Sequence, residues 1–374
     1  MKLANYLSTA KQDFAVIKKP ESENYLHLDV LRFIAAIGIV FFHYIHNADF
    51  GANHQLEKIV LDNNGFRLFV DIFFMISGFI IFALYHNRIS NSSEYYSFMK
   101  KRIARLIPLH FITLFFFIII GILISIFNIN INHPESYDNS CIIPNLLMIH
   151  SYNVCNSLTF NGASWSISAE MGMYLLAPIF IIMVTHIPVI AFFTSLIVIA
   201  ILFTASNSER YWFEWTFDFG VIRALPSFIL GMVLFKFKDK LKWIPFPSFM
   251  LFTFLTIFIL LQPILPKYIF LPIAYSIVLF AVAADSSEKI PKFVSSTAWL
   301  GRLTYSVYMI HGVISLLIIK VLSEKLFTFT GLEANLMILL TVILLIPISF
   351  ASLILFEMPM RRWITNIGRN KKDC

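Results

Sequence analysis

The stretch HLDVLRFIAAIGIVFFHYIH, residues 27–46, is long and apolar enough to cross a membrane as one helix, yet it contains Arg32 and His43. Ionisable side chains are costly to bury in lipid, so such residues indicate a functional site. The two residues are eleven positions apart, and at about 100° per residue they share one face of the predicted helix, roughly 16 Å apart along its axis. This face therefore carries a permanent cation near one membrane surface and an acid or base deeper in.

The rest of the chain has the composition of a membrane protein. Of its 374 residues, 58% are hydrophobic and 14% are charged, against about 25% charged residues in a typical soluble domain. We expect an all-α fold, a polytopic bundle of about ten transmembrane helices with no signal peptide. The ten expected spans are residues 28–46, 66–85, 106–127, 167–184, 187–204, 218–235, 244–262, 268–284, 300–320 and 334–356.

The distribution of basic residues predicts the orientation. An even number of spans puts both termini on one side, which we take as cytoplasmic. In that arrangement 20 of the 29 lysines and arginines fall in cytoplasmic segments and four in outside loops, as the positive-inside rule requires. We expect a cytoplasmic tail (1–26), a transmembrane domain (27–360) and a basic cytoplasmic tail (361–374). The net charge of +7 then reflects topology, and no nucleic-acid partner is expected.

The longest expected outside loop, about residues 128–166, contains no lysine or arginine but holds Cys141 and Cys155. Extracytoplasmic surroundings favour disulfides. The two cysteines either form such a bond or remain free thiols, and the sequence leaves both alternatives open. The third cysteine, Cys374, falls in the cytoplasmic tail and is expected to be free.

One group of polar residues lies at the expected cytoplasmic ends of the spans. Its members are basic and consist of Arg32, Arg102, Arg105, Arg302 and Arg361. Clustered guanidinium groups are well suited to bind phosphates. The alternative is that they only set the topology and meet anionic lipid headgroups.

A second group, expected nearer the outside, has acid–base character. His43 lies near the end of its span, while Asp71 and Glu170 lie in the first turns of two helices that enter from outside. A carboxylate beside a histidine is a common way to hold a general base in one tautomer. Alternatively His43 is an interfacial residue, and Asp71 pairs with Arg67 one turn away.

Two further ionisable residues lie inside expected spans. His311 follows Tyr305 and Tyr308 by two turns and one turn, and a buried histidine of this kind is more often structural than catalytic. Arg223 needs a partner that the sequence does not identify. The Cys and His spacing predicts no metal site.

Six short motifs follow one another along the chain. They are Leu28, Asp29, Leu31, Arg32 and His43; the stretch VDIFFMISGF at 70–79; Arg102, Arg105, Leu106 and Pro108; Trp165, Ser166, Ser168 and Glu170; Thr304, Tyr305, Ser306, Tyr308 and His311; and Glu357, Pro359 and Arg361. In this order they resemble the acyltransferase 3 family of integral-membrane acyltransferases, over about residues 25–363. Many relatives carry a fused hydrolase-like domain of the SGNH type, and we expect this chain to be a stand-alone form without it.

The resemblance implies an O-acetyltransferase of a bacterial inner membrane that modifies a cell-surface polysaccharide or glycolipid. It implies acyl-CoA, most often acetyl-CoA, as the donor and co-substrate. The donor would rest on Arg32, Arg102 and Arg105, with Tyr305 and His311 along its passage. His43 would act as general base or transient acyl carrier, and Glu170 or Asp71 would orient it.

The resemblance also assigns the Trp165, Ser166 and Ser168 motif to substrate binding. The acceptor, the acyl group and the oligomeric state are not specified by the sequence. The competing class is a transporter or flippase that moves a polar solute past the same charges. Binding of CoA to the purified protein would distinguish an acyltransferase from a transporter.

Overall fold

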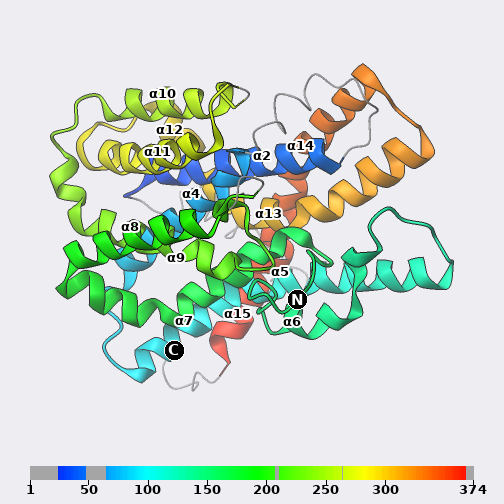
Figure 1. Ribbon diagram of the computed structural model, residues 1–374, viewed down its shortest axis with the longest axis horizontal. Helices are drawn as coiled ribbons and strands as arrows, with labels where there is room; N and C mark the ends of the chain where they lie inside the picture. Colours follow the sequence, from blue (N-terminus) through cyan, green and yellow to red (C-terminus); the bar gives the residue numbers. More distant parts are fainter. Residues whose placement is uncertain (1–23, 48–64, 207–209, 263, 368–374) are drawn as a thin grey trace, which may run out of the picture.

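A computed structural model of the protein describes residues 24–47, 65–206, 210–262 and 264–367. Every regular element in these ranges is a helix, and nine helical segments are long and apolar enough to cross a membrane (Figure 1). The expectation of an all-α polytopic membrane bundle is therefore confirmed. Most of the two terminal tails, Lys58 in its loop and Cys374 lie outside the described residues.

The α-helices are α2 (Leu26–Asn47), α4 (Phe69–Tyr85), α5 (Ser92–Ile126), α6 (Ile142–Leu146), α7 (Trp165–His186), α8 (Pro188–Ala205), α9 (Gly220–Phe237), α10 (Pro247–Leu260), α11 (Lys267–Ser287), α12 (Lys292–Thr297), α13 (Thr304–Ile314), α14 (Gly331–Ser352) and α15 (Met358–Asn366). Two π-helical segments are η8 (Ser315–Leu326) and η9 (Leu353–Glu357). The 3-10 helices are η1 (Gly65–Leu68), η2 (Pro134–Tyr137), η3 (Asn139–Cys141), η4 (Gly162–Ser164), η5 (Trp212–Glu214), η6 (Lys238–Leu241) and η7 (Ala298–Leu303).

Several of the ten expected spans have different bounds in the structure, and α5 and α10 are two of them. Helix α5 begins at Ser92 rather than near residue 106, because Asn91 caps it by accepting a hydrogen bond from the Glu94 amide at 3.0 Å. Its polar first turns continue the transmembrane part as one 35-residue helix. Helix α10 has only 14 residues, which reach about 21 Å at 1.5 Å per residue and fall short of a bilayer core of roughly 30 Å.

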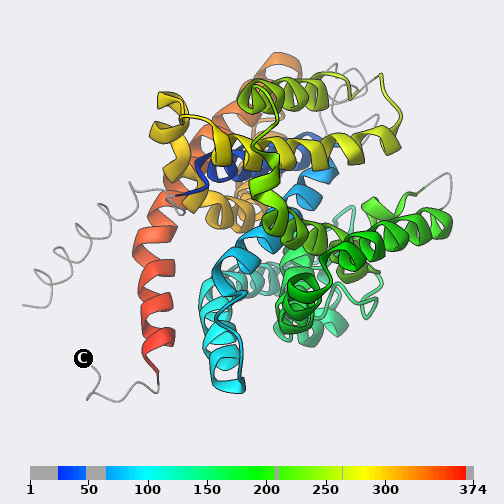
Figure 2. The ribbon, with the colours of Figure 1, turned by 90° about the vertical axis from the view of Figure 1, so that its left-hand side faces the viewer.

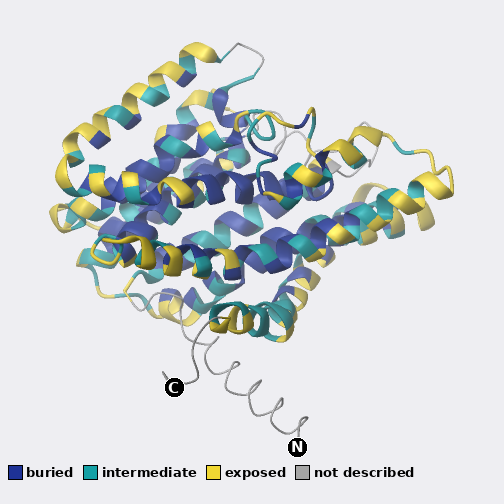
Figure 3. Ribbon diagram, turned by 90° about the horizontal axis from the view of Figure 1, so that it is seen from below, coloured by how far each residue is buried: buried dark blue, intermediate teal, exposed yellow. Residues whose placement is uncertain are grey.

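The centre of the bundle is formed by α4, α7 and α9, and α2 packs against α4. Of the apolar stretch of α4, 72% is buried inside the protein, against 17% of α8. Figure 3 shows buried residues along the inner helices and exposed residues along the outward faces. Helices α4 and α9 cross at Gly78 and Gly231, where an added Cβ would overlap the Phe228 and Met75 carbonyl oxygens respectively. Small residues at such crossings let membrane helices approach closely.

A buried polar chain connects the beginning of α2 to α10 and α11. Asp285 accepts hydrogen bonds from the His27 amide at 2.9 Å, from the His27 ring at 2.7 Å and from the Leu28 amide at 3.3 Å. The other ring nitrogen of His27 lies 3.2 Å from the Ser248 hydroxyl. These contacts fix where α2 enters the bundle, and therefore where Arg32 lies.

The long loop between α5 and α7 is held by a disulfide between Cys141 and Cys155. Of the two alternatives that the sequence leaves open, the structure thus shows the bonded one. Beneath the loop the rings of His110 and His150 stack with centroids 5.7 Å apart, and His150 Nε2 lies 3.0 Å from the Ser164 hydroxyl. Burial lowers the pKa of His150 to about 3, with the neighbouring His110 adding to the effect.

The C-terminal helices return to the α5 side of the bundle. Helix α15 packs against α5, and the two are seen together in Figure 2 as the red and cyan helices. The Lys100 ammonium donates a hydrogen bond to the Ile367 carbonyl. This packing brings Arg361 to the same cavity as the arginines of α5.

Candidate active site

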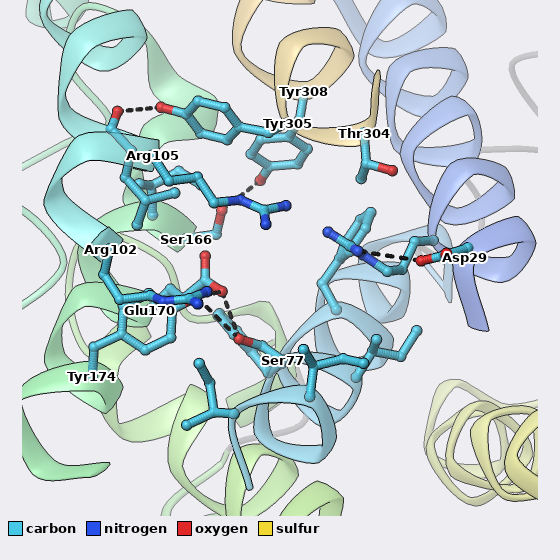
Figure 4. A pocket seen from close by; sticks show the side chains of 18 of the residues that line it. Asp29, Ser77, Arg102, Arg105, Ser166, Glu170, Tyr174, Thr304, Tyr305 and Tyr308 are labelled. Atoms are coloured by element: carbon cyan, nitrogen blue, oxygen red, sulfur yellow. Dashed lines mark hydrogen bonds and ion pairs between the residues drawn. The ribbon is translucent and has the colours of Figure 1, made fainter. Parts of the chain in front are cut away.

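A cavity of about 470 Å³ opens between α2, α4, α5, α7 and α13 (Figure 4). On α4 the side chains that line it recur at helical spacing, at Phe73, Ser77, Ile80 and Leu84. The other walls come from α2, α5, α7 and α13, whose lining residues extend from Asp29 to Tyr308 in the sequence. The cavity therefore exists only after the whole bundle has assembled.

Five arginines line this cavity. They come from α2, α5, η7 and α15 and are Arg32, Arg102, Arg105, Arg302 and Arg361. The basic group that the sequence placed at the cytoplasmic ends of separate spans is thus gathered around one space. Arg32 also forms an ion pair of 3.6 Å with Asp29, which lines the cavity as well.

The two arginines of α5 have different surroundings. Arg102 is 8% exposed, and its guanidinium carbon lies between 5.4 and 5.7 Å from the centroids of three aromatic rings, those of Tyr85, Phe98 and Tyr174. It also donates a hydrogen bond of 3.1 Å to the Tyr85 hydroxyl. Arg105 is less buried, and in Figure 4 its side chain extends into the cavity toward Tyr308. The guanidinium of Arg102 is thus enclosed by aromatic rings, whereas the side chain of Arg105 extends into the cavity itself.

Glu170 belongs to this cavity. Its Oε1 accepts hydrogen bonds from the Ser77 hydroxyl at 2.6 Å and from the Tyr174 hydroxyl at 2.5 Å. Since Tyr174 is also one of the rings around Arg102, Glu170 fixes the wall that holds this arginine.

Tyr308 forms the part of the cavity wall that faces the histidines. The Ser166 hydroxyl donates to the Tyr308 hydroxyl at 2.8 Å, and the Phe73 and Tyr308 rings meet edge-on with centroids 6.1 Å apart. Directly behind Tyr308 lies His311, with ring centroids 5.7 Å apart. Tyr308, Ser166 and Phe73 line the cavity, whereas His311 and His43 do not.

His43 and His311 form a pair behind this wall. His43 Nδ1 lies 2.7 Å from His311 Nε2, and the rings stack with centroids 5.0 Å apart. His311 Nδ1 lies 2.6 Å from the Tyr308 carbonyl oxygen. A carbonyl can only accept, so His311 carries its proton on Nδ1 and its Nε2 accepts from His43 Nδ1. The lone pair of His43 is therefore on Nε2.

This arrangement corrects the expectation that Asp71 or Glu170 orients His43. Glu170 bonds to Ser77 and Tyr174 in the cavity. Asp71 forms a buried ion pair with Arg223 at 2.7 Å, with both side chains at most 1% exposed. It does not pair with Arg67, whose guanidinium lies over the Phe42 ring. The partner of His43 is His311, and the partner that Arg223 requires is Asp71.

The remaining residues of the expected site have separate positions. Ser166 reaches the cavity, but Trp165 packs under the Arg223 guanidinium at 5.0 Å from its ring centroid. Ser168 is buried and donates to the Met148 carbonyl at 2.7 Å, so it holds the outer loop rather than the cavity. Tyr305 lines the cavity and donates to the Leu106 carbonyl.

Two of the cavity-lining residues that were not among the sequence-based candidates form hydrogen bonds with Glu170. They are Ser77, in the motif at 70–79, and Tyr174, four residues after Glu170. Helical spacing gives a signal for both, since i and i+4 share a face and Tyr174 follows Glu170 at that interval. Ser77 likewise follows Phe73 by four residues. A search of each motif for same-face neighbours would have found them.

Comparison with known proteins points to one family. A family model described as an acyltransferase domain matches residues 25–357. Acyltransferase MdmB of Streptomyces mycarofaciens is 30% identical over 163 residues, which are 42% of this chain and 40% of that protein. The chain thus matches less than half the length of this relative. No solved structure matches the chain.

Proposed function

The chain belongs to the acyltransferase domain family, and from this premise we propose that it transfers an acetyl group from acetyl-CoA to a hydroxyl of a cell-surface polysaccharide or glycolipid. The observation that carries the proposal is a cavity with arginines at its walls and a histidine pair behind its end. The arginines suit the phosphates of the donor, and the histidine pair suits proton transfer from the acceptor.

Two neighbouring helices repeat this order. Helix α2 has Arg32 near its beginning and His43 near its end, and α13, which packs against it, follows Arg302 and contains His311. The two arginines line the cavity, while the two histidines contact each other. The rise of roughly 16 Å from Arg32 to His43 is within reach of an extended pantetheine arm.

The arginines provide the chemistry for a CoA donor. A guanidinium binds phosphate through two parallel hydrogen bonds, and CoA carries several phosphate groups. Arg105 contacts them directly in this proposal, whereas Arg102, held by its three aromatic rings, supplies a fixed positive charge. The thioester end then points toward Ser166 and Tyr308, which line the cavity.

His43 acts as the general base. The acceptor hydroxyl gives its proton to His43 Nε2 while its oxygen bonds to the thioester carbonyl carbon. The carbon–sulfur bond breaks, and the CoA sulfur leaves as a thiolate that takes up the proton. The bond from His43 Nδ1 to His311 Nε2 strengthens as His43 becomes positive, so His311 stabilises the charged form. In the alternative route, His43 Nε2 attacks the thioester and carries the acyl group to the acceptor.

The proposed location is a bacterial inner membrane with both termini in the cytoplasm, an arrangement in which the short helix α10 serves as the tenth crossing. The bias in basic residues supports this orientation. The disulfide between Cys141 and Cys155 supports it independently, because it lies in the loop assigned to the oxidising side. The arginines then face the compartment that contains acyl-CoA.

The test uses membranes from cells that produce the full chain. Labelled acetyl-CoA is supplied to inside-out vesicles, and the label is followed into the glycan and lipid fractions. The proposal expects incorporation that requires the protein and is lost in Arg105→Ala at low donor concentration. Equal labelling of membranes with and without the protein would contradict it.

A further inference from the structure

We propose that Phe73 and Tyr308 form an aromatic wall that limits the acyl group to short chains, and that Tyr308 couples this wall to the histidine pair. The inference rests on the proposed acyl-CoA donor and deepens it. The sequence alone does not distinguish a short acyl group from a long one.

The first step is the position of the wall. Both residues line the cavity, and their rings meet edge-on at 6.1 Å, close to the separation usual for such pairs. Tyr308 is 5% exposed and lies between the cavity and His311. In the proposed donor pose, the acyl end lies against these rings.

The second step is how the wall is held. The Tyr308 ring is fixed by the hydrogen bond from Ser166, and the apolar side chains of Phe74 and Ile167 also line the cavity. Bulky apolar side chains packed in this way leave little room for a long chain beyond the carbonyl. An acetyl group ends where the rings begin, whereas each added methylene has to displace them.

The third step is the coupling to the histidine pair. The Tyr308 carbonyl accepts from His311 Nδ1, so the residue that bounds the cavity also sets the tautomer of the pair. The Ser166 hydroxyl has a second acceptor in the Ala163 carbonyl at 3.3 Å. Ser166 is thereby held between the Ala163 backbone and the Tyr308 hydroxyl, which keeps this ring in the cavity wall.

The experiment measures binding of stable ketone analogues, so it needs no acceptor. Purified full-length protein is titrated with 2-oxopropyl-CoA and 2-oxoheptyl-CoA, which stand in for acetyl-CoA and hexanoyl-CoA. The wild type is expected to bind the short analogue at least about tenfold more tightly, the scale on which a pocket discriminates a poorly fitting chain. Phe73→Ala is expected to reduce that ratio to below about threefold.

The matched control is Phe82→Ala. Phe82 is a buried phenylalanine on the same helix, but it packs against Phe235 and His86 and does not line the cavity. It should leave the ratio unchanged. If Phe73→Ala does not fold, Phe73→Leu should shift the ratio in the same direction by a smaller factor.

The outcomes separate the two proposals. The proposed aromatic wall would be contradicted if the ratio of affinities for the short and long analogues were unchanged in the Phe73 variants. It would also be contradicted if that ratio shifted equally in Phe82→Ala. Failure of the wild type to bind either analogue would instead contradict the acyl-CoA donor. If the wild type bound both analogues with equal affinity, the proposed limit on chain length would be wrong. The proposal that acyl-CoA is the donor would still stand.

Discussion

His43 Nδ1 lies 2.7 Å from Nε2 of His311, although the two residues are 268 positions apart in the chain. The Tyr308 carbonyl fixes the proton of His311 on its other nitrogen. The consequence is a directed chain of hydrogen bonds that leaves His43 with a lone pair on Nε2. A base is thereby prepared without a carboxylate.

Replacing His311 should therefore impair the chemical step and not donor binding. His311→Ala removes the acceptor for His43 Nδ1, and we expect kcat to fall by about 10²-fold, the lower end of the range for general base catalysis. The KM for acetyl-CoA should change little, because His311 does not line the cavity. Steady-state kinetics with acetyl-CoA varied would measure both.

His311→Gln is the informative companion, since its amide oxygen can also accept from His43 Nδ1. It should recover part of the lost kcat. Equal kcat in the wild type and His311→Ala would show that His311 is only a packing residue.

Replacing Arg105 should weaken the binding of the acetyl-CoA donor. Arg105→Ala removes charge-assisted hydrogen bonds, each worth about 1.5–3 kcal/mol, so the donor concentration for half-maximal rate should rise by roughly 10- to 100-fold. The matched control is Lys101→Ala, which removes a positive charge from the same helix at an exposed position outside the cavity. An identical donor dependence for the two variants would rule out a direct phosphate contact by Arg105.

The pair of Asp71 and Arg223 should be structural. Asp71→Ala leaves Arg223 as an unpaired buried cation, and we expect a loss of about 3–5 kcal/mol in the free energy of unfolding. The double variant Asp71→Leu with Arg223→Met replaces both charges by apolar groups and should recover much of that stability. Thermal unfolding in detergent would measure the stability of each variant. The rate of acetyl transfer per folded molecule would show whether the pair also acts in catalysis. A double variant that folds but is inactive would mean that Asp71 acts in catalysis.

The long outer loop should lose stability in acid because of His150. Its pKa is lowered to about 3 in the folded protein against an ordinary value of 6.5. Between these values the unfolded chain binds the proton and the folded protein does not, so stability falls as the pH decreases from about 6.5 toward 3. The contribution between pH 7.5 and pH 4.5 is on the order of 2–3 kcal/mol.

His150→Asn provides the comparison for this effect, because asparagine can still hydrogen-bond but does not titrate. Melting temperatures at the two pH values should differ less for this variant than for the wild type. The same difference in both proteins would mean that another group causes the acid sensitivity.

The sequence was informative about the helices because membrane spans are long, apolar and locally encoded. Its boundaries were less accurate where polar turns extend a span. Helix α5 begins fourteen residues earlier than expected because a local cap at Asn91 continues it through a basic segment. Hydropathy cannot detect such a start, since Lys100 to Arg105 do not resemble a membrane core.

The partners of the buried charges were less predictable than the charges themselves. The cost of burying Arg223 shows that it needs a partner, but Asp71 is 152 residues away and was itself assigned to the acid–base group. The sequence predicts that His311 lines the donor passage. Its contact with His43 is not predictable in this way, because it depends on how α2 and α13 pack. Pairings at such separations are set by the tertiary structure and leave no local pattern.

The most direct test of the account is the effect of His43→Ala on acetyl transfer, with donor binding measured on the same preparation. The variant should bind 2-oxopropyl-CoA with wild-type affinity, because His43 lies outside the cavity. Transfer of labelled acetyl from acetyl-CoA to the membrane glycan fraction should fall by at least about 100-fold. Undiminished transfer by a correctly inserted His43→Ala protein would contradict the central claim that His43 carries out the chemical step.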